Sequence, residues 1–307
     1  MADFKENYKM FDFHADDFGI SNNSCNNIIE LIEKGYLNSI SVLPNMSSFA
    51  YAVNRFNDGE YGDKIDVTIH LNFLEGHCCA NIEEIPDLVD EKGFFRISWS
   101  SLFKWNYNLF IRKKIKKQLV SEILAQATKC IDSGIVSKDN LRFDGHQHTQ
   151  MIPLVFEALI EACEILENEG CKITFIRNSQ DPILPYLRVK AIRKSFEKVN
   201  LIKCLILNYY SHCIQKKLRK KDIPICGLCG VFFSGKMDFY RLNVVLPFIE
   251  KKAERRNQKI EVLFHPGTVL PTEISEEFVK KDFNIFHTSP NRQIEYKSIS
   301  QIRNNEE

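Results

Sequence analysis

Short apolar segments alternate along the chain with longer segments of helical periodicity. The apolar segments are typical of buried strands, which we expect at residues 10–15, 39–43, 65–71, 141–144, 171–176 and 260–264. Between them, apolar residues recur every three or four positions and predict helices from Ser21 or Asn22 to Gly35, at 111–133 and at 153–167. Repeated strand–helix units are typical of a parallel sheet with crossover helices. The sequence therefore predicts an α/β fold, namely a (β/α) barrel that need not be regular.

Four of the predicted strands end in aspartate or histidine. These residues are Asp16 and Asp17, His70, the group Asp144, His146 and His148, and finally His265. In barrels and open α/β sheets, the loops that follow the carboxyl ends of the strands form the active site. The strand ends therefore predict a catalytic site assembled from distant parts of the chain.

The spacing of these residues suits a divalent cation. Adjacent carboxylates on a turn point in different directions, so one of Asp16 and Asp17 can hold a cation while the other accepts a proton from water. Taken alone, such a pair is more often part of a helix N-terminus. Two histidines and one carboxylate from separate strands form a common catalytic metal site.

Two histidine-containing motifs add polar groups to the same strand ends. In Asp144-Gly-His146-Gln-His148, alternation places three polar groups on one side of an extended segment, where a metal or a hydrogen-bond network would satisfy them. His70 and Asn72 share a strand face in the same way, although a single histidine on a strand is more often a core residue.

Composition limits the class of protein. The 307 residues are 44% hydrophobic and 26% charged, which is typical of a globular chain and fits a single domain over 1–307. The net charge of +1 predicts no general attraction to nucleic acid. Ten scattered cysteines, the absence of an apolar leader and the absence of an apolar run of about 18 residues predict free thiols and a cytoplasmic location.

One segment departs from this balance. Residues 183–221 hold 11 Lys and Arg but a single acid, Glu197, together with apolar residues at helical spacing. We favour a solvated, amphipathic helical insertion at the rim of the barrel. A peripheral contact with an anionic membrane or an acidic glycan is the alternative for such a segment. The sequence is also compatible with a homodimer, which is the commonest closed assembly.

Four motifs, in this order, resemble the YdjC-like (ChbG/HpnK) carbohydrate deacetylase family over about residues 10–290. They are His14-Ala-Asp-Asp-Phe-Gly19, His70-Leu-Asn72 with Gly76, Asp144-Gly-His-Gln-His148 with Pro153, and His265-Pro-Gly267. The resemblance implies a (β/α) barrel enzyme that uses a divalent metal to remove N-acetyl groups from amino sugars in oligosaccharides. His14 replaces an Asn that is frequent in the family, and Gln150 replaces a further His.

The resemblance also implies roles by motif position. Asp17, His70 and His146 would hold one divalent ion, either Zn²⁺ or Mg²⁺, with Mn²⁺ and Co²⁺ as alternatives. Asp16 would be the catalytic base and His265 the acid. Beyond the resemblance, the residues that we expect to contact these groups or the substrate are His14, Asn72, His148 and Arg177. Arg177 could bind a sugar hydroxyl, hold an active-site carboxylate or be a structural ion-pair partner.

The predicted function is the metal-dependent hydrolysis of an N-acetyl group on an amino sugar in an oligosaccharide or glycan. Its partner is therefore an N-acetylated saccharide. One alternative is a metal-dependent hydrolase of another bond, such as a phosphoester or a different amide, although the sequence lacks a glycine-rich phosphate loop. The other is a non-catalytic protein that binds a glycan or a membrane surface. Retention of the base, ligands and acid argues against it.

Overall fold

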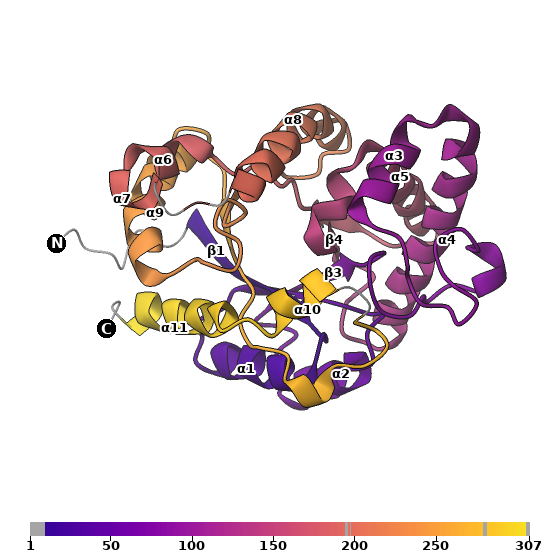
Figure 1. Ribbon diagram of the computed structural model, residues 1–307, viewed down its shortest axis with the longest axis horizontal. Helices are drawn as coiled ribbons and strands as arrows, with labels where there is room; N and C mark the ends of the chain where they lie inside the picture. Colours follow the sequence, from indigo (N-terminus) through magenta and orange to yellow (C-terminus); the bar gives the residue numbers. More distant parts are fainter. Residues whose placement is uncertain (1–9, 194–195, 197, 279–280, 305–307) are drawn as a thin grey trace.

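The predicted α/β barrel-like fold is confirmed by the computed structural model, which describes residues 10–193, 196, 198–278 and 281–304. Seven strands form one sheet that curls into a half-barrel (Figure 1). They are β1 (Phe11–Phe18), β2 (Ser39–Val42), β3 (Asp66–Leu71), β4 (Leu141–Gly145), β5 (Ile173–Ile176), β6 (Gly227–Cys229) and β7 (Ile260–Phe264). The spatial order is β5-β4-β3-β2-β1-β7-β6, and every neighbouring pair is parallel.

The sheet is open between β5 and β6, its two edge strands. The first five strands lie side by side in chain order, whereas β7 pairs with β1 and thereby brings the end of the chain next to its start. β6 was not predicted, because its three residues are too few for a periodic pattern. Since all strands are parallel, their carboxyl ends share one edge of the sheet.

Helices cover the outside of the curled sheet (Figure 1). The longer ones are α1 (Asn22–Glu33), α2 (Phe49–Asp58), α3 (Trp99–Tyr107), α4 (Leu109–Asp132), α5 (Pro153–Asn168), α8 (Lys198–Lys220), α9 (Phe239–Glu254) and α11 (Asn291–Asn304). Shorter helical segments are η2 (Ile82–Glu84), η3 (His146–Met151), α6 (Ile183–Arg188), α7 (Lys190–Arg193), η4 (Pro271–Glu273) and α10 (Lys281–His287). The Ser21 hydroxyl caps α1 by accepting from the Ser24 amide.

The core lies between the sheet and these helices. Every residue of β2 and β7 is buried, as expected for a parallel sheet covered by helices. Aromatic rings from separate strands meet within it, and Phe13 stacks on Phe264 with ring centroids 6.3 Å apart. Burial of one such side chain contributes about 2 kcal/mol. This packing holds the strand ends, and the polar residues on them, in place.

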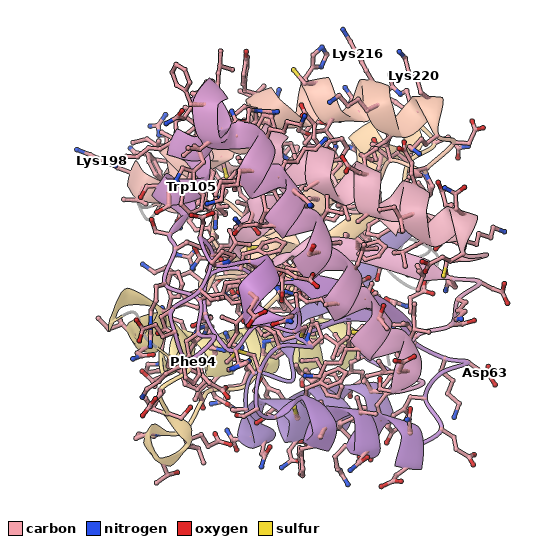
Figure 2. All side chains as sticks on the ribbon, turned by 90° about the vertical axis from the view of Figure 1, so that its right-hand side faces the viewer. Asp63, Phe94, Trp105, Lys198, Lys216 and Lys220 are labelled. Carbon is pink, nitrogen blue, oxygen red and sulfur yellow. The ribbon has the colours of Figure 1, made fainter. Side chains whose placement is uncertain are left out.

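The basic segment 183–221 is mostly helical in its described residues, which exclude Lys194, Ser195 and Glu197. It forms α6, α7 and α8 between the two edge strands. Lys198, Lys216 and Lys220 extend from α8 into solvent (Figure 2). Within the described residues, no helix has both the length and the apolar character that crossing a bilayer would require.

Candidate functional site

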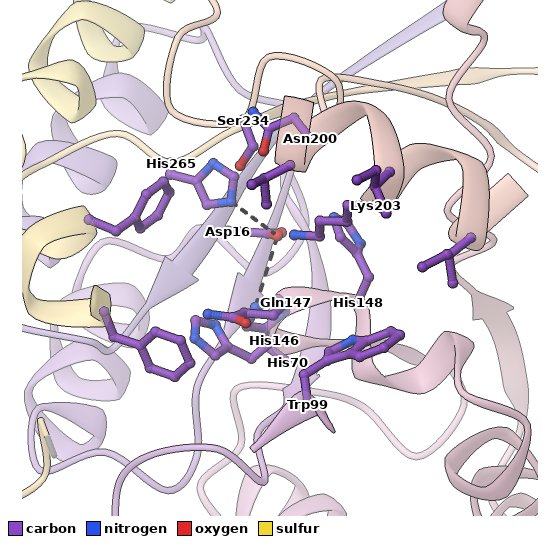
Figure 3. Close-up of a pocket in the computed structure, with 15 residues that line it drawn as sticks. Asp16, His70, Trp99, His146, Gln147, His148, Asn200, Lys203, Ser234 and His265 are labelled. Atoms are coloured by element: carbon purple, nitrogen blue, oxygen red, sulfur yellow. Dashed lines mark ion pairs between the residues drawn. The ribbon is translucent and has the colours of Figure 1, made fainter. Parts of the chain in front are cut away.

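A cavity of about 710 Å³ opens at the carboxyl ends of the strands (Figure 3). Asp16, His70, His146, His148 and His265 line it together with residues of α3, α8 and α10. These five residues are predicted from the sequence to follow strand ends, and the parallel sheet brings those ends to one place. The remaining lining residues are Trp99, Gln147, Val199, Asn200, Ile202, Lys203, Ile206, Ser234, Phe283 and Phe286.

Asp16 and Asp17 face different groups because the end of β1 is irregular. The register against β2 shifts between Ala15 and Phe18, and Asp17 has a φ of +66°. Aspartate is among the few residue types that occupy this region regularly. This irregular backbone directs the Asp16 side chain toward Arg177 and His265. It directs the Asp17 side chain toward His70 of β3 and His146 of η3.

Asp17, His70 and His146 form a compact cluster with metal-ligand spacing. Asp17 Oδ1 lies 3.6 Å from His70 Nε2 and 3.2 Å from His146 Nδ1. One candidate ligand atom from each residue lies within 4.8 Å of the others, and all three side chains are buried. An open site of two imidazoles and one carboxylate suits Zn²⁺, Mn²⁺ or Co²⁺, and it also accepts Mg²⁺ with water ligands.

A second carboxylate stands behind each of these histidines. His70 Nδ1 donates to Asp144 Oδ1 at 2.6 Å, so the Nε2 lone pair points toward Asp17. His146 Nε2 lies 2.9 Å from Glu75 Oε1, so its Nδ1 faces Asp17. Such partners fix the tautomer of a ligating imidazole and increase its basicity. The residues present therefore fit a divalent cation.

In the absence of a metal ion, a proton on His146 supplies positive charge to the cluster. Burial lowers the pKa of His146, but contacts with Asp17 and Glu75 outweigh it and raise that pKa to about 10. Burial raises the pKa of Asp17, whereas the Arg292 charge and the His146 contact bring it well below its usual range. Arg292 holds Asp17 directly, with Nη1 2.8 Å from Oδ2. The ion-free cluster therefore pairs an aspartate anion with two cations.

Asp16 is held by Arg177 through both carboxylate oxygens, at 2.9 and 3.1 Å. His14 Nε2 lies 3.1 Å from Asp16 Oδ1 on the side away from the cavity. Burial raises the pKa of Asp16, but Arg177, His70 and His14 together hold it well below the usual range. Asp16 is therefore an anion throughout the neutral range.

Arg177 is the centre of a buried ion network. Its guanidinium also contacts Asp144 Oδ2 at 2.8 Å and Glu261 Oε1 at 2.5 Å, and all four side chains are buried. From the sequence, Arg177 could bind a sugar hydroxyl, hold an active-site carboxylate or be a structural ion-pair partner. The geometry is that of the second, because Arg177 is not among the described residues that line the cavity.

His265 approaches Asp16 from the side opposite to His70, so that Asp16 lies between the two imidazole rings (Figure 3). Its Nε2 lies 3.9 Å from Asp16 Oδ2, and its Nδ1 lies 3.5 Å from Glu295 Oε2. The same Glu295 oxygen accepts from the His265 backbone amide at 2.6 Å. Glu295 thus fixes both the loop and the ring, leaving Nε2 toward the cavity.

Two expectations about side-chain direction were wrong. Gln147 and His148 have φ values of +53° and +60°, so the chain turns after β4 instead of continuing as an extended segment. This turn sends His148 away from His146 to Ser179, whose hydroxyl lies 2.9 Å from His148 Nδ1. Asn72 lies beyond the end of β3, where it accepts from the Leu74 amide and donates to the Glu75 carbonyl, so it shapes a loop.

Several residues that complete the site were not predicted from the sequence. Glu75, Arg292 and His287 contact the candidate ligands directly or through one another, and His287 Nε2 lies 2.8 Å from Glu75 Oε1. Glu75 follows His70-Leu-Asn72 by three residues, and that proximity was the available local signal. Arg292 and His287 come from the C-terminal region and carry no local signal of a role.

Comparisons with known proteins identify related chains. A family model described as YdjC-like protein matches residues 12–301. A carbohydrate deacetylase of Listeria monocytogenes is 29% identical over 146 residues, which are 47% of this chain and 53% of the relative. A carbohydrate deacetylase of Thermoanaerobacter pseudethanolicus is 27% identical over 148 residues, covering 48% and 54%. The matched part therefore spans about half the length of these curated relatives.

A solved structure shares the fold. It is described as a cellobiose-phosphate cleavage protein of Enterococcus faecalis, and it superposes with a TM-score of 0.58 at 17% sequence identity. The match covers 95% of this chain and 94% of that one, so the half-barrel is common to both over nearly their full length. The family match extends from β1 to α11 and includes every strand end described above. The chain therefore belongs to the YdjC-like family.

Proposed function

We propose that this protein is a metal-dependent hydrolase that removes an N-acetyl group from an amino sugar in an oligosaccharide or glycan. The observation that carries the proposal is the cluster of Asp17, His70 and His146 in the cavity wall beside Asp16 and His265. Similarity to proteins named carbohydrate deacetylase supports the choice of bond. One divalent ion is the expected cofactor, and Asp17, His70 and His146 would hold it.

The reaction needs an activated water, a polarised amide and a proton for the leaving amine. A divalent cation bound by the cluster would supply Lewis acidity toward the amide carbonyl and the water. We assign Asp16 as the acceptor of the proton from the attacking water, and its ionised state and its position in the cavity wall beside the cluster support this role. Arg177 keeps the Asp16 carboxylate in one orientation.

His265 is the group proposed to protonate the leaving amine. It lies across the cavity from the cluster, and its Nε2 faces Asp16. An imidazole is suited to this transfer near neutral pH. His148 is less suited, because burial and the Lys203 charge hold its pKa well below the usual range and leave it neutral. We therefore assign His148 a contact with substrate through Nε2.

The substrate is proposed to be an N-acetylated saccharide. Trp99 lines the cavity and stacks on Phe103 at 5.6 Å, so its ring is held as a platform against which a sugar can pack. The other aromatic residues of 94–107 do not line the cavity among the described residues. A cytoplasmic location and a homodimer remain predictions from the sequence.

The test is acetate release from a panel of N-acetylated oligosaccharides, with and without chelator, for the wild-type protein and for Asp16→Asn. Metal content is measured on both proteins by mass spectrometry. We expect chelator-sensitive release with about one ion per chain, and a loss of about 10²–10⁴-fold in Asp16→Asn with its metal content retained.

Three results would contradict the proposal. Full activity in Asp16→Asn would remove Asp16 as the base. Bound metal without acetate from any sugar, combined with turnover of phosphoesters or other amides, would assign the site to a different hydrolysis. If the protein bound glycans but neither bound a metal ion nor released acetate, it would be a glycan-binding protein and not an enzyme.

A further inference from the structure

One exposed face combines apolar side chains with positive charge. It is formed by α8 and by the junction of α3 and α4, which lie along the upper edge of the molecule in Figures 1 and 2. The hydroxyls of Tyr107 at the end of α3 and Tyr210 in α8 are 2.9 Å apart and join the two parts. The apolar members of this α3–α8 face are Tyr107, Leu109, Phe110, Val199, Ile202, Leu205 and Tyr209.

These apolar side chains are unusually exposed. The exposed fraction is 98% for Phe110 and 82% for Leu109. It is 72% for Val199 and 69% for Tyr209. The face holds seven of the thirteen large hydrophobic side chains that are exposed in the described part of the chain. Single exposed apolar residues are ordinary, but a group gathered on one face marks an interaction site.

The same two parts of the chain carry a concentrated positive charge. Residues 98–121 and 198–221 contain thirteen Lys and Arg and no Asp or Glu, whereas the whole chain has a net charge of +1. Some of these cations pair with acids of α5, such as Arg112 with Glu157. Among the described residues, Lys216, Arg219 and Lys220 of α8 have no carboxylate within 4.0 Å and are exposed.

We propose that the α3–α8 face binds the surface of an anionic lipid bilayer. Exposed Phe and Leu insert into the boundary between headgroups and acyl chains, while Lys and Arg beside them attract anionic headgroups. A polyanion such as an acidic glycan or a nucleic acid would engage the cations but leave Leu109 and Phe110 in water. A second copy would bring one positive face against another.

The contact places the cavity beside the membrane. Val199 and Ile202 belong to the α3–α8 face and also line the cavity, and Trp99 of α3 lines it too. The N-terminal turns of α8 therefore belong both to the wall of the cavity and to the face that contacts the bilayer. The inference does not depend on the proposed reaction, because the face and the metal cluster share no residue.

Vesicle co-sedimentation tests the proposal with the full chain. The probes are phosphatidylcholine vesicles with and without phosphatidylglycerol, at low and high salt. The charge variant is Lys216→Gln/Arg219→Gln/Lys220→Gln, and the apolar variant is Leu109→Ser/Phe110→Ser. Lys251→Gln/Arg255→Gln/Lys259→Gln is the matched charge control, and Tyr240→Ser/Phe248→Ser is the matched apolar control, because these residues are exposed in or just after α9.

We expect binding that requires phosphatidylglycerol and weakens with salt. Each removed charge should weaken it about fivefold, and the apolar variant should weaken it at least as much as the charge variant. Both control variants should bind like the wild type. Acetate release from soluble oligosaccharides, measured on the same samples, should be unchanged in all four variants and therefore reports separately on the proposed reaction.

Three results would overturn the inference. The first is no sedimentation with anionic vesicles. The second is an equal loss in the control variants, which would show attraction without a defined face. The third is a dimer by light scattering that Leu109→Ser/Phe110→Ser converts to a monomer, since the face would then be an interface between copies.

Discussion

Arg177 holds Asp16 by both carboxylate oxygens, and the same guanidinium reaches Asp144 and Glu261. One cation thereby joins the candidate base to the residue that orients a candidate metal ligand. Burying these charges is costly unless they stay paired. The arrangement keeps Asp16 ionised and directed at the cavity, at the expense of its basicity.

Replacing Arg177 with Lys should distinguish the effect of its positive charge on catalysis from the effect of its contact with both oxygens of Asp16. Lysine keeps a cation but cannot bind both oxygens of Asp16 at once. We expect kcat to fall about 100-fold, with a smaller change in KM, because the base is misoriented more than substrate binding is weakened. Steady-state kinetics and a thermal unfolding curve check this together. Wild-type kcat in a folded Arg177→Lys protein would show that the two-oxygen contact has no role.

Glu75 should control metal affinity through His146. Its carboxylate contacts His146 Nε2, and Gln in its place would weaken both the tautomer preference and the basicity of Nδ1. We expect Glu75→Gln to lower the affinity for Mn²⁺ or Zn²⁺ about 10- to 100-fold in titration calorimetry.

Glu122→Gln is the matched control for Glu75→Gln. Glu122 is also a buried glutamate, but it accepts from the Cys79 and Ala80 backbone amides instead of contacting a candidate ligand. It should lower stability without changing metal affinity. Equal affinity losses in the two variants would attribute the effect of Glu75 to general loosening of the fold.

Metal binding should release a proton from His146. The pKa of His146 is raised to about 10 in the ion-free protein, so at neutral pH the ring carries a proton that a cation must displace. Apparent metal affinity should therefore rise about tenfold per pH unit between pH 7 and 9. Calorimetry in buffers of different ionisation enthalpy measures the released proton. An affinity that does not change with pH would contradict a protonated His146.

The same raised pKa predicts how the stability of the ion-free protein depends on pH. A folded pKa of about 10, compared with about 6.5 in the unfolded chain, means that the folded state binds the proton more tightly. This contribution is fully present below pH 6.5 and is lost as pH rises through 10. Urea unfolding of chelator-treated protein should show stability falling over that range by a few kcal/mol. Rising stability would contradict this assignment.

Gly76 should be required for the loop that carries Glu75. Its φ is +80°, and a Cβ there would lie 2.7 Å from Met46 Sδ and 2.8 Å from the Asn45 backbone oxygen. We expect Gly76→Ala to cost about 3 kcal/mol and to weaken metal binding. Gly62→Ala is the control, because a Cβ at Gly62 has no neighbour within 4 Å and its φ is not positive. Urea denaturation compares them, and equal stability would refute the requirement.

The fold class, and the edge of the sheet at which the site forms, follow from local patterns in the chain. Apolar runs such as 260–264 coincide with β7, and Ser21 caps α1 as its residue type indicates. These features depend on local propensity and on the periodicity of burial, both of which are present in neighbouring residues. Once the strands are parallel, the positions of Asp16, His70 and His265 at their ends follow.

Which side chains meet around those strand ends depends on the three-dimensional packing of the chain. Glu75 and His287 are 212 positions apart, and Asp17 and Arg292 are 275 apart, yet each pair is in contact. The direction of His148 depends on two positive φ values that no residue type there predicts. Such contacts arise because buried charges must find partners wherever packing brings them together. No local pattern in the chain encodes that pairing.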